Sequence, residues 1–94
     1  MVLEYTPAGA VTANTPVALP GGARMQRLTR VTLFTGSDGT VAAAASELTI
    51  VTDAPEAGEC RLVGDGQIEF GDALTAANKV TIEGDELGSR PIAA

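Results

Sequence analysis

Carboxylates are the most numerous ionisable side chains of this chain, and five aspartates lie in or beside predicted turns. A group of carboxylates could bind a divalent cation, or two of them could act as a general acid and base. None of the five begins a calcium loop, because the alternating acids and the closing Glu are missing. Aspartate is common in turns because its side chain bonds the nearby backbone, and this explains the position of the five aspartates. The alternative interpretation is a weak adventitious cation site. We therefore predict no metal site at Asp38, Asp53, Asp65, Asp72 or Asp85.

Nucleophilic and phosphate-binding chemistry lack their usual residues. The chain has no His and a single Cys, Cys60, so neither a Cys–His nucleophile nor a Cys–His zinc set can form within it. Cys60 also has no partner for an internal disulfide. Gly64-Asp65-Gly66 leads into a predicted strand rather than a helix, so no helix N-terminus follows to bind a phosphate. With one Tyr and two Phe to line a cleft, we expect no enzyme and no cofactor.

Three arginines, Arg24, Arg27 and Arg30, are half of the six basic residues and lie close together in the sequence. Arginine is enriched at interfaces because its planar guanidinium donates in a fixed geometry, so these residues are the candidate partner interface. The partner would be an acidic neighbouring subunit. The alternative is a solvated edge that neutralises Asp and Glu of the same chain.

The chain has 94 residues, which suits one small domain, and a net charge of −6 from 12 acidic and 6 basic residues. This charge repels phosphate backbones, so we expect no nucleic-acid partner. A surplus of carboxylates with one Lys is typical of chains that stay soluble in high salt; a halophilic source is one interpretation, and an acidic domain from a GC-rich genome is the other. No apolar run approaches the roughly 20 residues that span a bilayer, so we expect no membrane association.

The first 22 residues are predicted to form an extended arm, because three prolines disfavour helix there. Within this arm, residues 2–5 and 17–19 suit short edge strands. The arm either docks on a neighbouring subunit or is a loosely held terminus. Residues 23–84 are the predicted β domain, and residues 85–94 a C-terminal tail.

The middle of the chain predicts a hairpin. Residues 28–35 are rich in β-branched and apolar types and suit a strand, and 36–39 supply an Asp-Gly turn. A four-residue loop pairs Thr35 with Thr40 and Phe34 with Val41. We interpret 41–46 as the return strand, followed by strand-like residues 47–52 and a loop at 53–58.

Residues 59–70 predict a second hairpin whose register follows from the face that each residue occupies. A two-residue loop mixes apolar and charged residues on one face. A three-residue loop, with Gly66 in the left-handed conformation, separates them and places opposite charges across the ladder. Cys60 then becomes a small buried hydrophobe. The resulting pairs are Cys60 with Phe70, Arg61 with Glu69, and Leu62 with Ile68.

The last segments follow from similar patterns. Residues 71–78 predict one helical turn, with Asp72 as its N-cap and Asn78 as a left-handed exit. Residues 79–83 alternate as a strand, so that Val80 and Ile82 face the core. Residues 84–94 suit a surface strand or an arm.

Residues 55–70, Asp72-Ala73 and 79–82 carry a pattern of a Gly-containing loop, a hairpin that ends in Phe, an Ala-rich turn and a strand. This pattern resembles small β-rich structural proteins of tailed viruses. The Ala-, Thr- and Pro-rich N-terminus is similar to the extended arms of capsid decoration proteins. The resemblance implies a virion location, with the host cytoplasm during assembly, and major capsid or other virion subunits as partners.

Together these observations predict an all-β fold, a small sandwich or partly open barrel of about six to eight strands with extended N- and C-terminal arms. The expected function is a non-enzymatic virion structural protein that decorates or cements a capsid through arm docking and β-edge contacts. A homo-oligomer is expected, with a trimer favoured. The alternatives are a head–tail joining or tail component, and a soluble ligand-binding β module.

Overall fold

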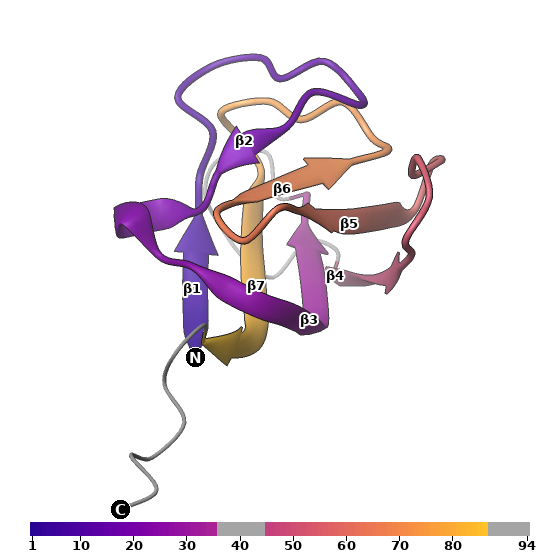
Figure 1. The fold of residues 1–94 in the computed structure, drawn as a ribbon. Helices are drawn as coiled ribbons and strands as arrows, with labels where there is room; N and C mark the ends of the chain where they lie inside the picture. Colours follow the sequence, from indigo (N-terminus) through magenta and orange to yellow (C-terminus); the bar gives the residue numbers. More distant parts are fainter. Residues whose placement is uncertain (36–44, 87–94) are drawn as a thin grey trace, which may run out of the picture.

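The computed structural model describes residues 1–35 and 45–86, which form the expected all-β fold (Figure 1). Seven strands and one short 3-10 turn follow one another in this part of the chain. Their bounds are β1 Val2–Tyr5, β2 Val17–Ala18, η1 Pro20–Gly22, β3 Met25–Phe34, β4 Ala45–Ile50, β5 Glu59–Val63, β6 Gln67–Phe70 and β7 Lys79–Glu86.

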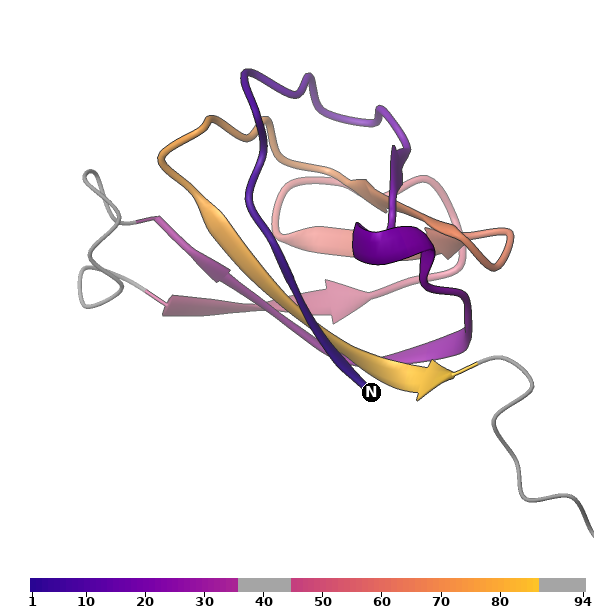
Figure 2. The same cartoon turned by 90° about the vertical axis from the view of Figure 1, so that its left-hand side faces the viewer.

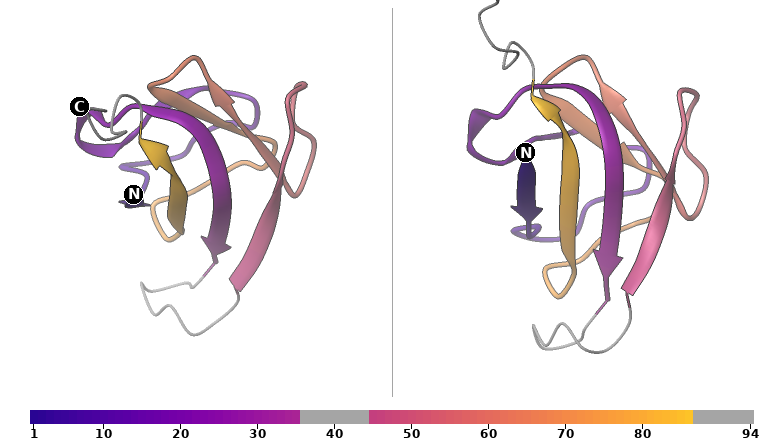
Figure 3. Two further views of the ribbon diagram at one scale, coloured as in Figure 1. Left: turned by 60° about the horizontal axis from the view of Figure 1, so that its bottom comes forward. Right: turned by 90° about the horizontal axis from the view of Figure 1, so that it is seen from below.

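The strands form one sheet in the order β1-β7-β3-β4-β5-β6-β2. Neighbouring strands are antiparallel except β4 and β5, which run parallel and pair over two positions, Thr49 with Glu59 and Ile50 with Cys60. The sheet is open and curls into a half-barrel, as Figures 2 and 3 show from different sides. Of the two architectures expected from the sequence, the partly open barrel is therefore the one observed.

Apolar side chains from both halves of the curled sheet enclose the core. Tyr5 of β1 stacks on Phe70 of β6, with ring centroids 6.2 Å apart, so strands that are distant in the sheet order meet inside the molecule. Cys60 is fully buried, which confirms the prediction that it is a small buried hydrophobe. This burial raises the pKa of its thiol to about 12. The buried apolar residues are Leu19, Met25, Leu28, Val31, Leu33, Leu48, Cys60, Ile68, Phe70, Leu74, Val80 and Ile82.

The first half of β3 buries every third residue, Met25, Leu28 and Val31, whereas a regular strand buries every second one. Its register with β7 shifts between Met25 and Arg27 and again between Leu28 and Arg30. Gln26 and Thr29 are therefore the extra residues of two β-bulges. Each bulge restarts the alternation, which brings residues three apart to the same face.

The hairpin of β5 and β6 has the predicted register, with Arg61 opposite Glu69 and Cys60 opposite Phe70. The predicted left-handed Gly66 is wrong, because Gly64 takes this conformation instead, with φ 60°. The carbonyl groups of Asp65 and Gly66 accept hydrogen bonds from the backbone N–H groups of Met25 and Leu19, at 2.7 and 2.9 Å. These bonds to residues 19–25 fix the orientation of the Asp65 and Gly66 carbonyl groups. The left-handed conformation therefore falls on Gly64, the first residue of the turn.

The predicted pairing of β3 with its return strand is also wrong. Phe34 pairs with Ala45 rather than with Val41. The predicted turn at 36–39, Thr40 and Val41 lie outside the described residues. Strand β4 covers parts of both segments, 41–46 and 47–52, that were expected to follow the turn. The run of alanines in 41–46 gives no alternation of faces, so an Asp-Gly turn signal alone determined the predicted register.

Residues 71–78 form no helical turn, which corrects the predicted N-cap at Asp72 and left-handed exit at Asn78. Leu74 instead forms a β-bridge with Val11. Asn78 closes a turn, since its side-chain oxygen accepts from the backbone N–H of Thr75 at 2.8 Å. The carboxylate of Asp72 accepts from the backbone N–H of Gly58 at 2.9 Å. Asp72 thus bonds the β4–β5 loop and Asn78 bonds its own segment, and neither caps a helix.

The N-terminal residues, expected as an extended arm, lie along both edges of this chain's own sheet. Strand β1 pairs with β7, and β2 pairs with β6. Pro7 and Leu19 are buried in the same segment. At the other end, Val80 and Ile82 face the core as predicted, and β7 continues to Glu86. The tail beyond Glu86 lies outside the described residues.

Candidate interaction surface

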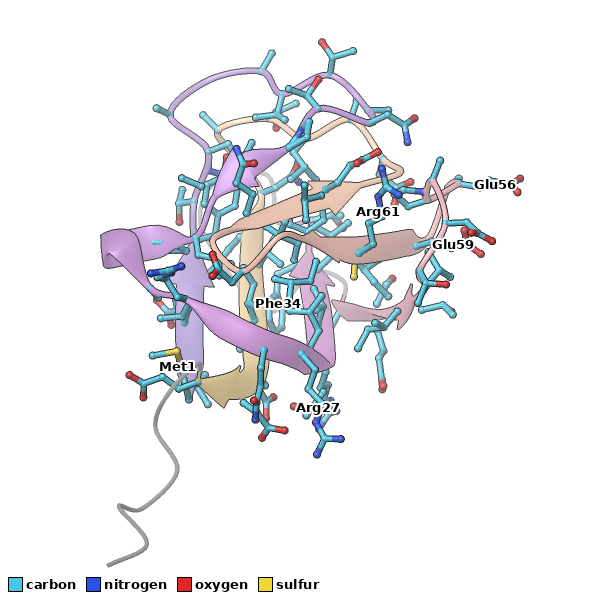
Figure 4. All side chains as sticks on the ribbon, in the orientation of Figure 1. Met1, Arg27, Phe34, Glu56, Glu59 and Arg61 are labelled. Carbon is cyan, nitrogen blue, oxygen red and sulfur yellow. The ribbon has the colours of Figure 1, made fainter. Side chains whose placement is uncertain are left out.

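The three candidate interface arginines lie along the start of β3 and each pairs with a carboxylate of this chain. Arg24 pairs with Asp65 in the β5–β6 turn, and Arg27 pairs with Asp85 in β7. The Nε of Arg30 lies 3.8 Å from the carboxylate of Glu47 in β4. Side chains of all three are more than half exposed, and Figure 4 shows Arg27 projecting away from the ribbon. The structure thus spreads the arginines over three separate contacts.

The bulges of β3 explain why arginines three positions apart can all be exposed. In a regular strand, Arg27 would face opposite to Arg24 and Arg30. The two bulges place every arginine just before a buried residue, in the order Met25, Leu28 and Val31. The guanidinium of Arg24 lowers the pKa of the Asp65 carboxyl, chiefly through their hydrogen bond. Exposed pairs of this kind contribute little stability.

A second charged cluster lies where Asn14 of the β1–β2 connection meets β6 and its neighbour β5. Arg61 donates from Nε and Nη2 to the same oxygen of Glu69, at 3.0 and 2.9 Å. Asn14 donates from Nδ2 to the other oxygen of Glu69 at 3.2 Å and to the carbonyl of Pro55 at 2.8 Å. Figure 4 shows Arg61 on β5 below this connection. Glu69 is 4% exposed as a result, which the cross-strand pattern alone did not predict.

The backbone of Asn14 is left-handed, with φ 64°, a conformation that Asn adopts more readily than most residues. Its N–H donates to the carbonyl of Phe70 at 2.8 Å. The hydrogen bond from Asn14 and the charge of Arg61 together lower the pKa of the Glu69 carboxyl, against the opposing effect of desolvation. This cluster fastens the N-terminal segment to the sheet.

The edge strand β1 offers backbone groups with which no other strand of residues 1–35 and 45–86 pairs. The backbone groups of Met1 and Gly84 exchange two hydrogen bonds, each 3.1 Å long. In an antiparallel ladder such pairs recur at every second residue, so Leu3 and Tyr5 also bond to β7. The N–H and C=O groups of Val2 and Glu4 therefore point away from the sheet, and within the described residues nothing is bonded to them.

The side chains of β1 add an apolar character to this edge. Val2 is 63% exposed, the highest fraction among the described large apolar residues. Glu4 is partly neutralised by Lys79 of β7, with 3.0 Å between Nζ and the carboxylate. Natural edge strands are often protected by an outward Lys, a Pro or a bulge, and β1 has none of these between Val2 and Tyr5. The sequence predicted this edge strand but not which of its backbone groups face outward.

A shallow groove of about 330 Å³ lies where β4 ends and the sheet bends. On one side is the start of β3, and on the other is β5. Its lining mixes apolar and polar residues, and its charged residue, Arg27, is paired with Asp85. The lining residues are Gln26, Arg27, Leu28, Ile50, Val51, Thr52, Leu62 and Gly64.

The five turn aspartates are the candidate metal ligands of this chain. Of the turn aspartates, Asp65 and Asp85 pair with arginines, and Asp38 lies outside the described residues. Within residues 1–35 and 45–86, no group of three or more Asp, Glu, His or Cys side chains is arranged to hold a metal ion. The same residues contain no helix long and apolar enough to cross a membrane.

No family model, curated protein or solved structure matches this chain.

Proposed function

We propose that this chain is a non-enzymatic structural protein of a tailed-virus particle, which decorates or cements the capsid through a β-edge contact. The observation that carries the proposal is the uncovered edge of β1, with the outward backbone groups of Val2 and Glu4 and the exposed side chain of Val2. An uncovered edge is a template for strand addition, which structural proteins use to join subunits.

The placement of the aromatic residues favours this function over a ligand-binding β module. Such a module commonly presents an aromatic platform or a deep apolar pocket. Here Tyr5 and Phe70 stack on each other, and Phe70 is buried in the core. The groove beside Arg27 contains no aromatic residue. The exposed apolar surface of β1 is thus better suited to a protein partner than to a small molecule.

The test is the location of the chain in cultures of the organism that encodes it. Particles are purified on a density gradient after infection or induction, and their proteins are quantified by mass spectrometry. We expect the chain to sediment with the major coat protein in many copies per particle, and an antibody against it to label the particle surface. A chain that stays entirely in the unsedimented fraction, while the coat protein sediments, would refute the proposal.

A further inference from the structure

We propose that β1 pairs with β1 of a second copy of this chain, antiparallel and with Leu3 on the two-fold axis. This inference deepens the proposed function, because it names a partner for the same edge, and it rests on that edge being a docking site. An antiparallel pair of identical strands uses the same surface on both copies and closes with two of them. The expected assembly is therefore a dimer, in place of the trimer favoured by the sequence.

The orientation of the backbone groups restricts the possible registers. Only Val2 and Glu4 point their N–H and C=O groups outward along β1. In an antiparallel pair, such residues must lie opposite each other to exchange hydrogen bonds. Three registers satisfy this condition: Val2 opposite Val2, Val2 opposite Glu4, and Glu4 opposite Glu4. Odd-numbered residues cannot replace them, because their backbone groups already bond to β7.

Charge and overlap select one of the three registers. Glu4 opposite Glu4 places like charges directly across the ladder, which is destabilising. Val2 opposite Val2 leaves a single hydrogen-bonded pair in the overlap. Val2 opposite Glu4 occurs twice by symmetry and makes four N–H···O bonds, while each Glu4 keeps its contact with Lys79. This register puts Leu3 opposite Leu3 and buries the exposed side chain of Val2 against the stem of the Glu4 side chain.

The shape of the half-barrel leaves β1 as the suitable edge for this contact. The other end strand of the sheet, β2, has two residues and offers too short an edge. The turn η1 lies beside β1 without forming a ladder with it, as Figure 1 shows. A strand that pairs with β1 needs outward backbone groups two residues apart and no carboxylate opposite Glu4. The β1 strand of a second copy meets both conditions, because its Val2 lies opposite Glu4.

The first experiment measures the mass of the full chain by sedimentation equilibrium over a wide range of concentration. We expect a dimer of twice 9.5 kDa, with a dissociation constant between about 1 µM and 1 mM because the interface is small. Val2→Pro removes an outward N–H without touching the ladder with β7. We expect it to raise the dissociation constant about tenfold or more. The matched control, Val2→Thr, keeps the N–H and the β-branched shape and should still dimerise.

The second experiment determines the register through disulfide formation between copies. In the proposed register, the Cα atoms of the two Leu3 residues lie about 4.5 Å apart, within the range that a disulfide spans. Leu3→Cys should therefore cross-link under mild oxidation. Val2→Cys and Glu4→Cys should not, because each is about 8 Å from its own symmetry mate along the diagonal. Cys60 does not interfere, since it is fully buried.

Each result separates this inference from the proposed function. A monomer or a trimer at millimolar concentration, a dimer that persists in Val2→Pro, or cross-linking only through Val2→Cys or Glu4→Cys would overturn the proposed pairing. A dimer with Leu3→Cys cross-links, from a chain that is absent from virus particles, would overturn the virion role and leave the pairing established. A chain that is found in virus particles but sediments as a monomer when purified would support the virion role and overturn the pairing.

Discussion

Glu69 shows how a distant segment changes the environment of a single carboxylate. Its partner Arg61 lies directly across the ladder, and such a pair on an open sheet would be solvated. Asn14 covers the pair and donates to the second carboxylate oxygen, so that both oxygens of Glu69 are hydrogen-bonded. Buried carboxylates are stable only when they are bonded and paired in this way. The cluster is therefore sensitive to the charge of Glu69.

We predict that Glu69 makes stability depend on pH in the acid range. Its pKa is lower in the folded chain than in the unfolded one, chiefly through the hydrogen bond from Asn14 and then through Arg61. A depressed pKa stabilises the fold above the unfolded value of about 4.3, and this stabilisation is lost as pH falls through the folded pKa. Glu69→Gln should therefore unfold more easily than the parent at pH 7, and the difference should shrink below about pH 4.

Urea unfolding at several pH values measures this difference. Glu4→Gln is the matched control, because Glu4 is mostly exposed and also contacts one cation, Lys79. It should lower the free energy of unfolding less than Glu69→Gln at pH 7. A Glu69→Gln deficit that stays constant from pH 7 to pH 3 would show that shape, and not charge, gives Glu69 its effect.

The sequence predicted part of this cluster. The alternation of residues 59–70 correctly predicted that Arg61 lies opposite Glu69. Only one of the registers considered places the charged residues on one face and the apolar residues on the other. It could not show that Glu69 is buried, since the covering residue, Asn14, lies 55 positions away and carries no local signal of that contact. The same limit applies to Arg24, whose partner Asp65 is 41 positions away.

Among the elements, β3 and β7 lie close together at Gly84, where β3 carries its bulges. Gly84 of β7 lies opposite Leu28, between the two register shifts. A Cβ atom built on Gly84 would lie 2.5 Å from the carbonyl oxygen of Arg27 and 2.6 Å from the sulfur of Met25. The backbone of the bulged strand therefore occupies the space that any larger residue needs.

We predict that Gly84→Ala destabilises the fold by about 1–3 kcal/mol or more, because a backbone carbonyl must move to admit the methyl group. Gly66→Ala is the matched control. No atom lies within 4 Å of its Cβ position, and its φ is not positive, so this change should range from neutral to a gain of about 1 kcal/mol. Guanidinium unfolding curves of both variants provide the measurement. Equal stability of the two would mean that the β3–β7 contact relaxes at no cost.

The elements also differ in how well the sequence predicts them. The hairpin at 59–70 is predictable because its apolar, charged and turn residues favour one register. The pairing of β3 with β4 is not, since small alanines precede Ala45 and suit several registers equally. The three-residue spacing of Met25, Leu28 and Val31 does not match the two-residue alternation of a regular strand. The two bulges explain how this spacing occurs in a sheet.

At the scale of the whole molecule, the half-barrel combines an uncovered edge with a net charge of −6. Two copies that approach through β1 must overcome their mutual repulsion. This repulsion extends over about 30 Å in 0.01 M salt but only about 3 Å in 1 M salt. Pairing through backbone hydrogen bonds and Val2 is itself hardly weakened by salt. The salt dependence of association therefore reports which surface joins the copies.

We predict that raising sodium chloride from 0.01 to 1 M lowers the dissociation constant of the dimer roughly tenfold, because screening removes most of the repulsion between two chains of charge −6. Sedimentation equilibrium at each salt concentration measures the change. Val2→Pro should keep a dissociation constant about tenfold or more above that of the parent at every salt concentration, whereas nonspecific salting-out would affect both chains equally. The opposite trend would point to a different interface. If Arg24, Arg27 and Arg30 joined the copies by leaving their own carboxylates for those of a neighbour, attraction between opposite charges would carry the contact. Salt would then weaken the dimer, and the β1 edge would have to be abandoned in favour of the arginines.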